Sequence, residues 1–235
     1  MDPLSITLNI IKLIAPLITG IIALIAGFIE LRFNPKNWLN RWFFSFFISA
    51  SLGYLIYSAY HLVIFSPTIT SIAAVITQIF FNFIPISLVM TVFVLEKFPK
   101  IAMSFRYLGL MMLVFVLMSF GYFFLPPIPD PFLFTQGVIN TETYAPWFVF
   151  VNILRMELFG YALFKYAMIT KKTEGEAKRR IRWFFIGILI FIIGLIFNLL
   201  GGILSTTNIL ALITEILALI LFNLGAIVIV KGFII

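Results

Sequence analysis

Seven long apolar stretches dominate this sequence, and they limit its fold more than any other feature. A helix needs roughly 20 apolar residues to cross a hydrocarbon core about 30 Å thick, and every stretch exceeds that length. Their hydrophobicity is continuous rather than alternating, which argues against the strands of an outer-membrane barrel. We therefore predict one all-α integral membrane domain over residues 1–235, a bundle of seven transmembrane helices. The predicted helices cover about residues 5–29, 40–65, 68–97, 103–126, 146–170, 181–204 and 208–234.

The composition excludes several classes of protein. Hydrophobic residues make up 63% of the chain and charged residues 11%, whereas a soluble domain carries about 25% charged residues. The chain has no cysteine and a single histidine, His61, which leaves neither disulfides nor a multi-histidine or cysteine-ligated metal site. Phosphate-binding, zinc-protease and serine-hydrolase motifs are absent from the sequence. We predict a protein that is not an enzyme and that needs no cofactor or metal.

The polar segments between the stretches contain residues typical of turns. Asn34-Pro35-Lys36-Asn37 separates the first two stretches, and Ser66-Pro67-Thr68 precedes the third, where Ser66 is placed to cap the helix. Lys97-Phe98-Pro99-Lys100 separates the third and fourth stretches. A proline-rich connection runs from Pro126 to Pro146, and Ser205-Thr206-Thr207-Asn208 forms the last short turn.

The basic residues predict how the helices are oriented in the membrane. The net charge is +7, and in a membrane protein such an excess is usually carried by cytoplasmic connections rather than by a nucleic-acid site. The connections after the second, fourth and sixth stretches hold no Lys or Arg, and the fourth carries only Asp130 and Glu142. The positive-inside rule therefore puts the N-terminus outside and the C-terminus in the cytoplasm. The basic residues after the first, third and fifth stretches are Arg32, Lys36 and Arg41; Lys97, Lys100 and Arg106; and Lys171, Lys172, Lys178, Arg179, Arg180 and Arg182.

Two parts of the chain share a short pattern. Arg41-Trp42-Phe43-Phe44 and Arg182-Trp183-Phe184-Phe185 open the second and sixth stretches, and a glycine follows each at equal spacing. The same offset aligns Phe81-Asn82 with Phe222-Asn223. Parallel repeats of three helices joined by the fourth would explain the pattern. Chance matches among common aromatic and aliphatic residues would explain it equally well.

Polar residues inside the stretches are the candidate site. Ionisable groups within a membrane are costly and often functional. At a rise of about 1.5 Å per residue, Arg155 and Glu215 come out at similar depth, about 12 Å below the outer boundary, so we expect them to pair. Three interpretations remain open at this stage: a buried network that locks helices together, a polar pocket open to the outside, and side chains that face lipid. The candidate ligand-binding residues are Lys12, His61, Arg155, Glu157, Asn198 and Glu215.

Three uncharged polar residues lie deeper, near the middle of the membrane. They are Gln78, Asn82 and Asn223. Hydrogen bonding between helices is their commonest role, whereas in a transporter such midplane groups would contact the solute. Lys165 lies near the inner end of the fifth stretch, where we expect its side chain to reach the membrane surface.

Two segments resemble a known family. They are Glu30-Leu31-Arg32-Phe33-Asn34-Pro35-Lys36-Asn37 and Arg179-Arg180-Ile181-Arg182-Trp183-Phe184-Phe185-Ile186-Gly187. With the N-out orientation, they resemble the seven-helix N-terminal sensor region of prokaryotic histidine kinases and related signalling proteins. The resemblance implies a multi-pass protein of a prokaryotic plasma membrane. It also implies a cytoplasmic output domain, which we expect this chain to lack because it stops at the membrane after Lys231.

These observations favour a stand-alone seven-helix sensor or receptor-like protein. It would bind a small ligand, or sense the membrane, through the polar residues of its outer half. Its partners would be membrane lipids and a cytoplasmic signalling protein such as a histidine kinase, with a homo-oligomer as a further option and no nucleic acid. The alternatives are a small-solute transporter of the three-plus-one-plus-three kind and a structural subunit of a membrane complex.

Overall fold

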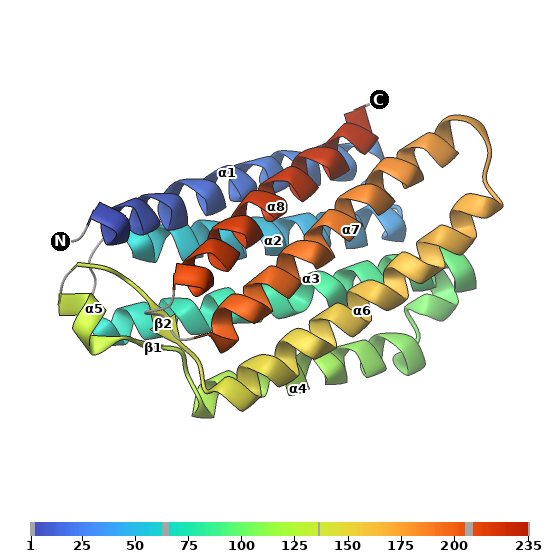
Figure 1. The fold of residues 1–235 in the computed structure, drawn as a ribbon. Coiled ribbons are helices and arrows are strands. Elements are labelled where there is room, and N and C mark those ends of the chain that lie inside the picture. Colours follow the sequence, from blue (N-terminus) through green and yellow to red (C-terminus); the bar gives the residue numbers. More distant parts are fainter. Residues whose placement is uncertain (1–2, 63–65, 136, 205–208, 235) are drawn as a thin grey trace.

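A computed structural model describes residues 3–62, 66–135, 137–204 and 209–234, and nearly all of them are helical (Figure 1). Seven of the helices are long and apolar enough to cross a membrane. The chain is therefore a multi-pass membrane protein built as an all-α bundle. Its elements are α1 (Pro3–Phe33), α2 (Trp38–Leu62), α3 (Pro67–Ala102), the π-helical turn η1 (Phe105–Gly109), α4 (Leu110–Phe124), β1 (Ile128–Pro129), α5 (Pro131–Thr135), β2 (Thr141–Glu142), α6 (Ala145–Lys171), α7 (Gly175–Ile203) and α8 (Ile209–Ile234).

The seven predicted stretches correspond to α1, α2, α3, η1 with α4, α6, α7 and α8, so the predicted number of spans is confirmed. The largest difference is at α7, which begins at Gly175 rather than at residue 181, because the charged segment before the apolar stretch also forms helix. The predicted turn at residues 205–208 and the end of the second stretch at residues 63–65 lie outside the described residues.

The residues predicted to form turns affect the structure of α3 at both of its ends. The Ser66 hydroxyl accepts a hydrogen bond from the amide of Ile69 at 3.4 Å, and Pro67 follows in the first turn, as the capping prediction requires. Near the other end, Phe98 leaves the helical conformation with φ 62° and ψ 152°. Because a residue before proline is disfavoured in the α conformation, the helix breaks at the predicted Phe98-Pro99 position.

Six of the long helices form a closed ring. In order around the ring, α1 contacts α2, α2 contacts α3, α3 contacts α6, α6 contacts α7, α7 contacts α8, and α8 returns to α1. Helix α4 lies outside this ring, packed mainly on α3 (Figure 1). Most of the exposed surface of α4 is therefore apolar side chain that faces outward.

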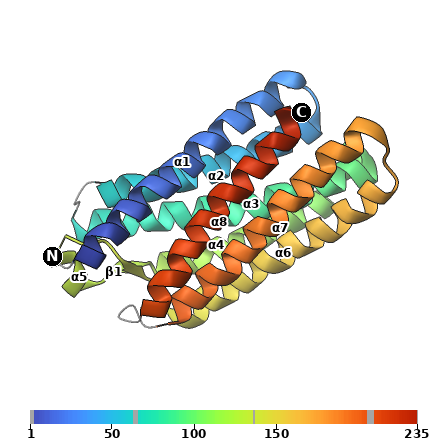
Figure 2. The same ribbon diagram turned by 45° about the horizontal axis from the view of Figure 1, so that its top comes forward.

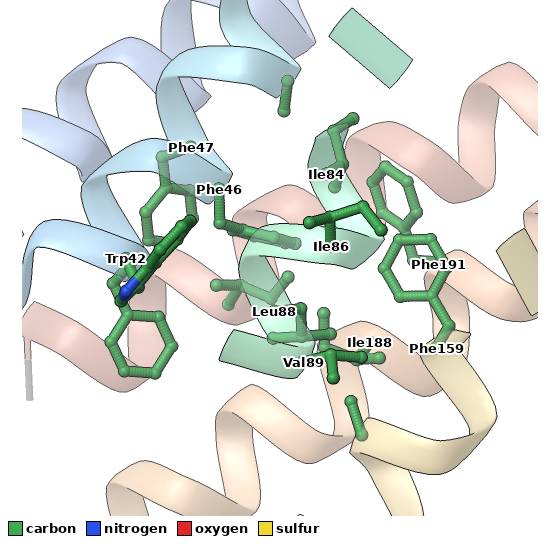
Figure 3. Close-up of a cluster of buried hydrophobic side chains, with 14 of the residues drawn as sticks. Trp42, Phe46, Phe47, Ile84, Ile86, Leu88, Val89, Phe159, Ile188 and Phe191 are labelled. Atoms are coloured by element: carbon green, nitrogen blue, oxygen red, sulfur yellow. The ribbon is translucent and has the colours of Figure 1, made fainter. Parts of the chain in front are cut away.

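The densest part of the core lies around the middle of α3. Every residue from Ile84 to Val94 is buried, and a helix that is apolar and buried all round must have neighbours on every side. Figure 3 shows side chains from several helices meeting there, with the rings of Phe159 and Phe191 side by side at 6.1 Å between centroids. Shape-matched packing of this kind is what holds helices together in lipid, where helix association has no hydrophobic driving force.

Two glycines, Gly53 and Gly194, let neighbouring helices approach closely. They are the two glycines that the short shared pattern of the second and sixth apolar stretches aligns with each other. A Cβ atom on Gly53 of α2 would lie 2.6 Å from the ring of Phe81 on α3. A Cβ atom on Gly194 of α7 would lie 2.8 Å from the ring of Phe222 on α8. In both places an aromatic ring of one helix therefore fills the space that the glycine of the next helix leaves.

The two ends of the bundle differ in charge and in structure (Figure 1). At one end, which we call the basic end, lie three connections: those between α1 and α2, between α3 and η1, and between α6 and α7. Together with the adjoining helix ends they hold most of the Lys and Arg residues. At the other end, which we call the loop end, residues 125–135 and 137–144 form a cap that contains β1, α5 and β2. The N-terminus of α1 lies at the loop end and the C-terminus of α8 at the basic end.

Candidate functional site

The cap is a folded element that covers the loop end of the bundle. Strands β1 and β2 pair antiparallel, with Ile128 opposite Glu142, and the Asp130 carboxylate accepts hydrogen bonds from the first amides of α5. Ile139 is buried in a cluster with Tyr60 of α2, against which Phe134 of α5 also packs. The cap is thus anchored on the bundle by apolar contacts.

Lys12 connects this cap to two helices. Its ammonium group lies 2.9 Å from Oε1 of Glu215 on α8 and donates a hydrogen bond to Oδ1 of Asn140 in the cap at 3.0 Å. The Lys12 side chain is 2% exposed and that of Glu215 27% exposed. We call Lys12, Glu215 and Asn140 the Lys12 cluster. It joins α1, α8 and the cap through one buried cation.

His61 lies at the loop end of α2 among aromatic rings. Its Nδ1 donates a hydrogen bond to the carbonyl oxygen of Tyr57 at 2.7 Å. Its ring lies 4.4 Å from that of Tyr57 and 4.5 Å from that of Tyr60 between centroids. The imidazole is therefore held at the edge of the same apolar cluster that anchors the cap.

Arg155 of α6 occupies a separate buried site on the other side of the ring. Its Nε and Nη2 donate to Oδ1 of Asn82 at 2.9 Å and 2.6 Å, and Nη2 also donates to Oε1 of Gln78 at 2.8 Å. Nη1 lies 3.4 Å from Oδ1 of Asn152, and the hydroxyl of Tyr122 on α4 lies 3.4 Å from the same Gln78 oxygen. We call these five residues the amide cluster. It joins α3, α4 and α6.

The acceptors that surround Arg155 are all uncharged. Arg155 is 5% exposed, and no carboxylate of the described residues lies within ion-pair distance of its guanidinium group. A charged group in hydrocarbon must be paired or hydrogen-bonded, and here planar amide acceptors match the fork of guanidinium donors. The predicted pair of Arg155 with Glu215 is therefore wrong: Glu215 pairs with Lys12 instead.

The remaining candidates lie apart from both clusters. Glu157 is two residues beyond Arg155 and is exposed on the outer surface of α6, because a step of two residues turns the side chain to nearly the opposite face of a helix. Asn198 is half-buried on α7 and makes no side-chain hydrogen bond to another described residue. The structure thus divides the six predicted ligand-binding residues among two clusters, the aromatic site of His61 and two isolated positions.

The three midplane residues all make hydrogen bonds between helices. Gln78 and Asn82 hold Arg155, and Asn82 also donates to the carbonyl oxygen of Met118 on α4 at 2.9 Å. Asn223 of α8 donates to the carbonyl oxygen of Ala15 on α1 at 3.1 Å, directly before Pro16. This arrangement agrees with the hydrogen-bonding role expected for such residues.

Lys165 forms an ion pair rather than only reaching the membrane surface. Its ammonium group lies 2.9 Å and 3.2 Å from the two carboxylate oxygens of Glu96 on α3. Both side chains are about a quarter exposed. We had expected only that the Lys165 side chain reaches the membrane surface. The ion pair was not predicted because nothing in the sequence showed that Glu96 and Lys165 lie at the same level on adjacent helices.

An apolar groove of about 550 Å³ opens beside the amide cluster. Its walls are Ile72, Ile76 and Ile79 of α3, Phe123 of α4 and Ile128 of β1, and Tyr122 also lines it. Tyr122 therefore belongs both to the amide cluster, through its hydroxyl contact with Gln78, and to the wall of the groove. Its size lies within the range of small-molecule sites, about 300–1,000 Å³.

Three residues of these clusters were not among the predicted site residues. Asn152 could have been found, since it lies three residues before Arg155 on the same helical face. Tyr122 and Asn140 carried no such signal, because one lies on the peripheral helix and the other in a long connection. Their partners are fixed only by how α4 and the cap fold onto the bundle.

Together the fold and the clusters define a seven-helix membrane protein with two buried polar sites, one of which contacts the cap. The described residues contain no group of three metal-ligating side chains. No known protein family matches the sequence, and no curated protein matches it either.

Proposed function

We propose that this chain is a non-enzymatic seven-helix sensor of a prokaryotic plasma membrane. In this proposal the loop end faces outward and the basic end faces the cytoplasm, following the positive-inside rule. The cap and the Lys12 cluster receive a small ligand or report on the state of the membrane. The basic end contacts a cytoplasmic signalling protein such as a histidine kinase, as the family resemblance implies.

The observation that carries this proposal is the position of Lys12. One buried ammonium group holds the cap through Asn140 and the last helix through Glu215. A ligand with a negative group that reached Lys12 would compete with Glu215, and movement of the cap would remove Asn140. Either event changes the contact between α1 and α8, two helices that run from the loop end to the basic end (Figure 2).

A ligand shifts a conformational equilibrium only through its different affinity for the two states. The Lys12 cluster supplies such a difference, because its ion pair requires the described arrangement of α1 and α8, and its hydrogen bond to Asn140 requires that of the cap. Glu215 is partly exposed, so the cluster lies at the boundary between the buried interior and the surface. This position is suited to a contact that an external ligand opens.

The sensor proposal is tested by measuring whether the Lys12 cluster controls the basic end. The chain lacks cysteine, so spin labels attached at Lys36→Cys and Thr173→Cys report a single distance across the basic end. The proposal requires that Lys12→Met or Glu215→Gln shift the distribution of this distance. Glu142→Gln, an exposed carboxylate of the cap, is the matched control. Unchanged distances in both cluster variants would contradict the proposal.

We propose a small-solute transporter as the second candidate, because the contacts of the ring are compatible with a three-plus-one-plus-three repeat. If α1, α2 and α3 are replaced by α6, α7 and α8 in that order, and the reverse, each helix contact of the ring falls on another contact of the ring. For example, the contact of α1 with α2 corresponds to that of α6 with α7. The packing of Gly53 on Phe81 and of Gly194 on Phe222 follows the same exchange. Such repeats are common in transporters.

Cysteine accessibility separates the two candidates. Ser51 of α2 and Ser87 of α3 are fully buried within the bundle. A transporter that alternates between two open states exposes its interior to both sides in turn, so single cysteines at these positions would react with a membrane-impermeant maleimide from either side. For a sensor we expect that these cysteines do not react with maleimide added from the side of the basic end. Labelling of right-side-out and of inside-out vesicles distinguishes the two sides.

A further inference from the structure

Glu157 occupies an unusual position on the surface of the bundle. It lies 12 residues after Ala145 and 14 residues before Lys171, so it is at the middle of α6. Its side chain is exposed, and the same surface of α6 exposes Phe150, Ile153 and Phe164. In a helix that crosses the membrane, this is a carboxyl group facing the centre of the hydrocarbon region.

The other long helices expose only apolar side chains at their middle. Among the described residues, Glu157 is the only exposed ionisable side chain that lies more than ten positions from both ends of its helix. Lys12, Arg155 and Glu215, the other charged residues at depth, all have partners within the bundle. The hydrogen-bonding needs of Glu157 are therefore not met within the part of the chain that the structure describes.

The surface around Glu157 has the form of a helix-packing seam. Phe150, Ile153, Glu157, Gly160 and Phe164 follow one another at spacings of three and four residues, the spacing of a seam between two left-handed supercoiled helices. A Cβ atom on Gly160 would meet nothing within 4 Å. Small residues at such a position let a second helix approach closely in a membrane.

The chemistry of the carboxyl group identifies the occupant. In hydrocarbon it must be neutral and hydrogen-bonded, or else paired with a cation. The described helices expose no cation at their middle, so another molecule of this chain cannot offer an ion pair. It can offer a second Glu157, and two neutral carboxyl groups are complementary because each donates its proton to the carbonyl oxygen of the other.

We propose that two copies of this chain associate through the exposed face of α6, with the two Glu157 side chains hydrogen-bonded to each other. Closed dimers usually have two-fold symmetry, in which the same patch is used on both subunits. With the two-fold axis along the membrane normal, identical residues lie at the same depth, so the two Glu157 side chains meet at the centre of the seam. Gly160 then lies one turn away, where the backbones approach.

Disulfide cross-linking tests the interface directly, because the chain has no cysteine of its own. In the full-length protein reconstituted in phosphatidylcholine vesicles, we expect Ile153→Cys and Gly160→Cys to form dimers on mild oxidation. Leu117→Cys on α4 and Ile21→Cys on α1 are matched controls, since both positions are exposed to a similar extent. Equal cross-linking at seam and control positions would overturn the proposal.

Variants of Glu157 test the hydrogen bond. Glu157→Leu should raise the dissociation constant of the dimer by roughly 10-fold, the effect of losing one interhelical hydrogen bond in a membrane. Glu157→Gln should retain the dimer, because an amide also donates and accepts. Both changes lie on the surface, so the thermal stability of the monomer in detergent should stay unchanged and serves as the folding control.

The two variants also separate this proposal from a different partner. If the true occupant were a foreign helix with a basic residue, purified protein would be monomeric in vesicles by single-molecule photobleaching. A monomeric parent protein, or a Glu157→Leu variant that dimerises as well as the parent, would overturn the proposal. The inference does not depend on the sensor function, since a dimer of this form is compatible with a transporter as well.

Discussion

The ion pair between Lys12 and Glu215, with Nζ 2.9 Å from Oε1, joins the first and last long helices of the chain. The two side chains differ in environment, because Lys12 is 2% exposed and Glu215 27% exposed. Loss of the carboxylate would therefore leave a buried ammonium group with only Asn140 as a partner. Loss of the lysine would leave a carboxylate that is already partly exposed.

The first prediction follows from this asymmetry. Glu215→Gln should lower the free energy of unfolding by about 3 kcal/mol, the lower end of the range for breaking a buried ion pair, and Lys12→Met should lower it by less. The double variant should recover part of the loss, because no charge is then left unpaired. Thermal or denaturant unfolding in detergent measures all three. Strictly additive losses would show that the two residues are not coupled.

The pair of Lys165 and Glu96 is the control for this cycle. Its nitrogen–oxygen distance is equally short, at 2.9 Å, but both side chains are about a quarter exposed. Exposed pairs contribute about 0–1 kcal/mol. We therefore expect Lys165→Met and Glu96→Gln each to change stability by less than the variants of the Lys12 cluster.

The second prediction concerns the amide cluster. Asn82 accepts from two nitrogens of Arg155 and donates to Met118, so Asn82→Ala leaves a buried cation short of acceptors. Hydrogen bonds to charged groups contribute about 1.5–3 kcal/mol, and we expect a loss of that size. Adding Arg155→Met should restore part of it, since the charge that needs the acceptors is removed. Asn198→Ala is the matched asparagine control and should have little effect.

The third prediction concerns the contact between α7 and α8. A Cβ atom on Gly187 would lie 2.9 Å from the carbonyl oxygen of Gly225 and 3.0 Å from the amide nitrogen of Ile229. These are backbone atoms, which cannot move without displacing the helix. Gly187→Ala should therefore destabilise the protein by about 1–3 kcal/mol. Gly160→Ala, which adds its methyl group in open space, should leave the stability of the monomer unchanged or slightly raise it; equal losses would contradict the prediction.

The fourth prediction concerns orientation in the membrane. Single cysteines in residues 128–145 should react with an impermeant maleimide from outside intact cells, and those in residues 171–180 only after the membrane is opened. The reason is that Lys and Arg are absent from the connections after the second, fourth and sixth apolar stretches. Inverted labelling of the two segments would contradict the proposed orientation and the outward-facing cap with it.

The part of the site that the sequence predicted is the set of polar residues and their approximate depth. Lys12, Arg155 and Glu215 were recognised as costly ionisable groups within apolar stretches, and all three are in contact with polar partners. The predicted pair was wrong because it was chosen by matching depth, and depth carries no information on which helices are neighbours. The choice between Lys12 and Arg155 depends on which helix lies beside α8.

The sequence by itself determined the seven spans and the segregation of basic residues to alternate connections. Both are local properties, because the bilayer requires about 20 apolar residues per helix whatever the neighbours are. Only the tertiary structure decided that α8 lies against α1 and α6 against α3, which gives Glu215 to Lys12 and Asn82 to Arg155. It also decided that Glu157 faces outward. Apolar stretches carry little information about helix order or rotation, since in lipid these depend on close packing and hydrogen bonds between particular side chains.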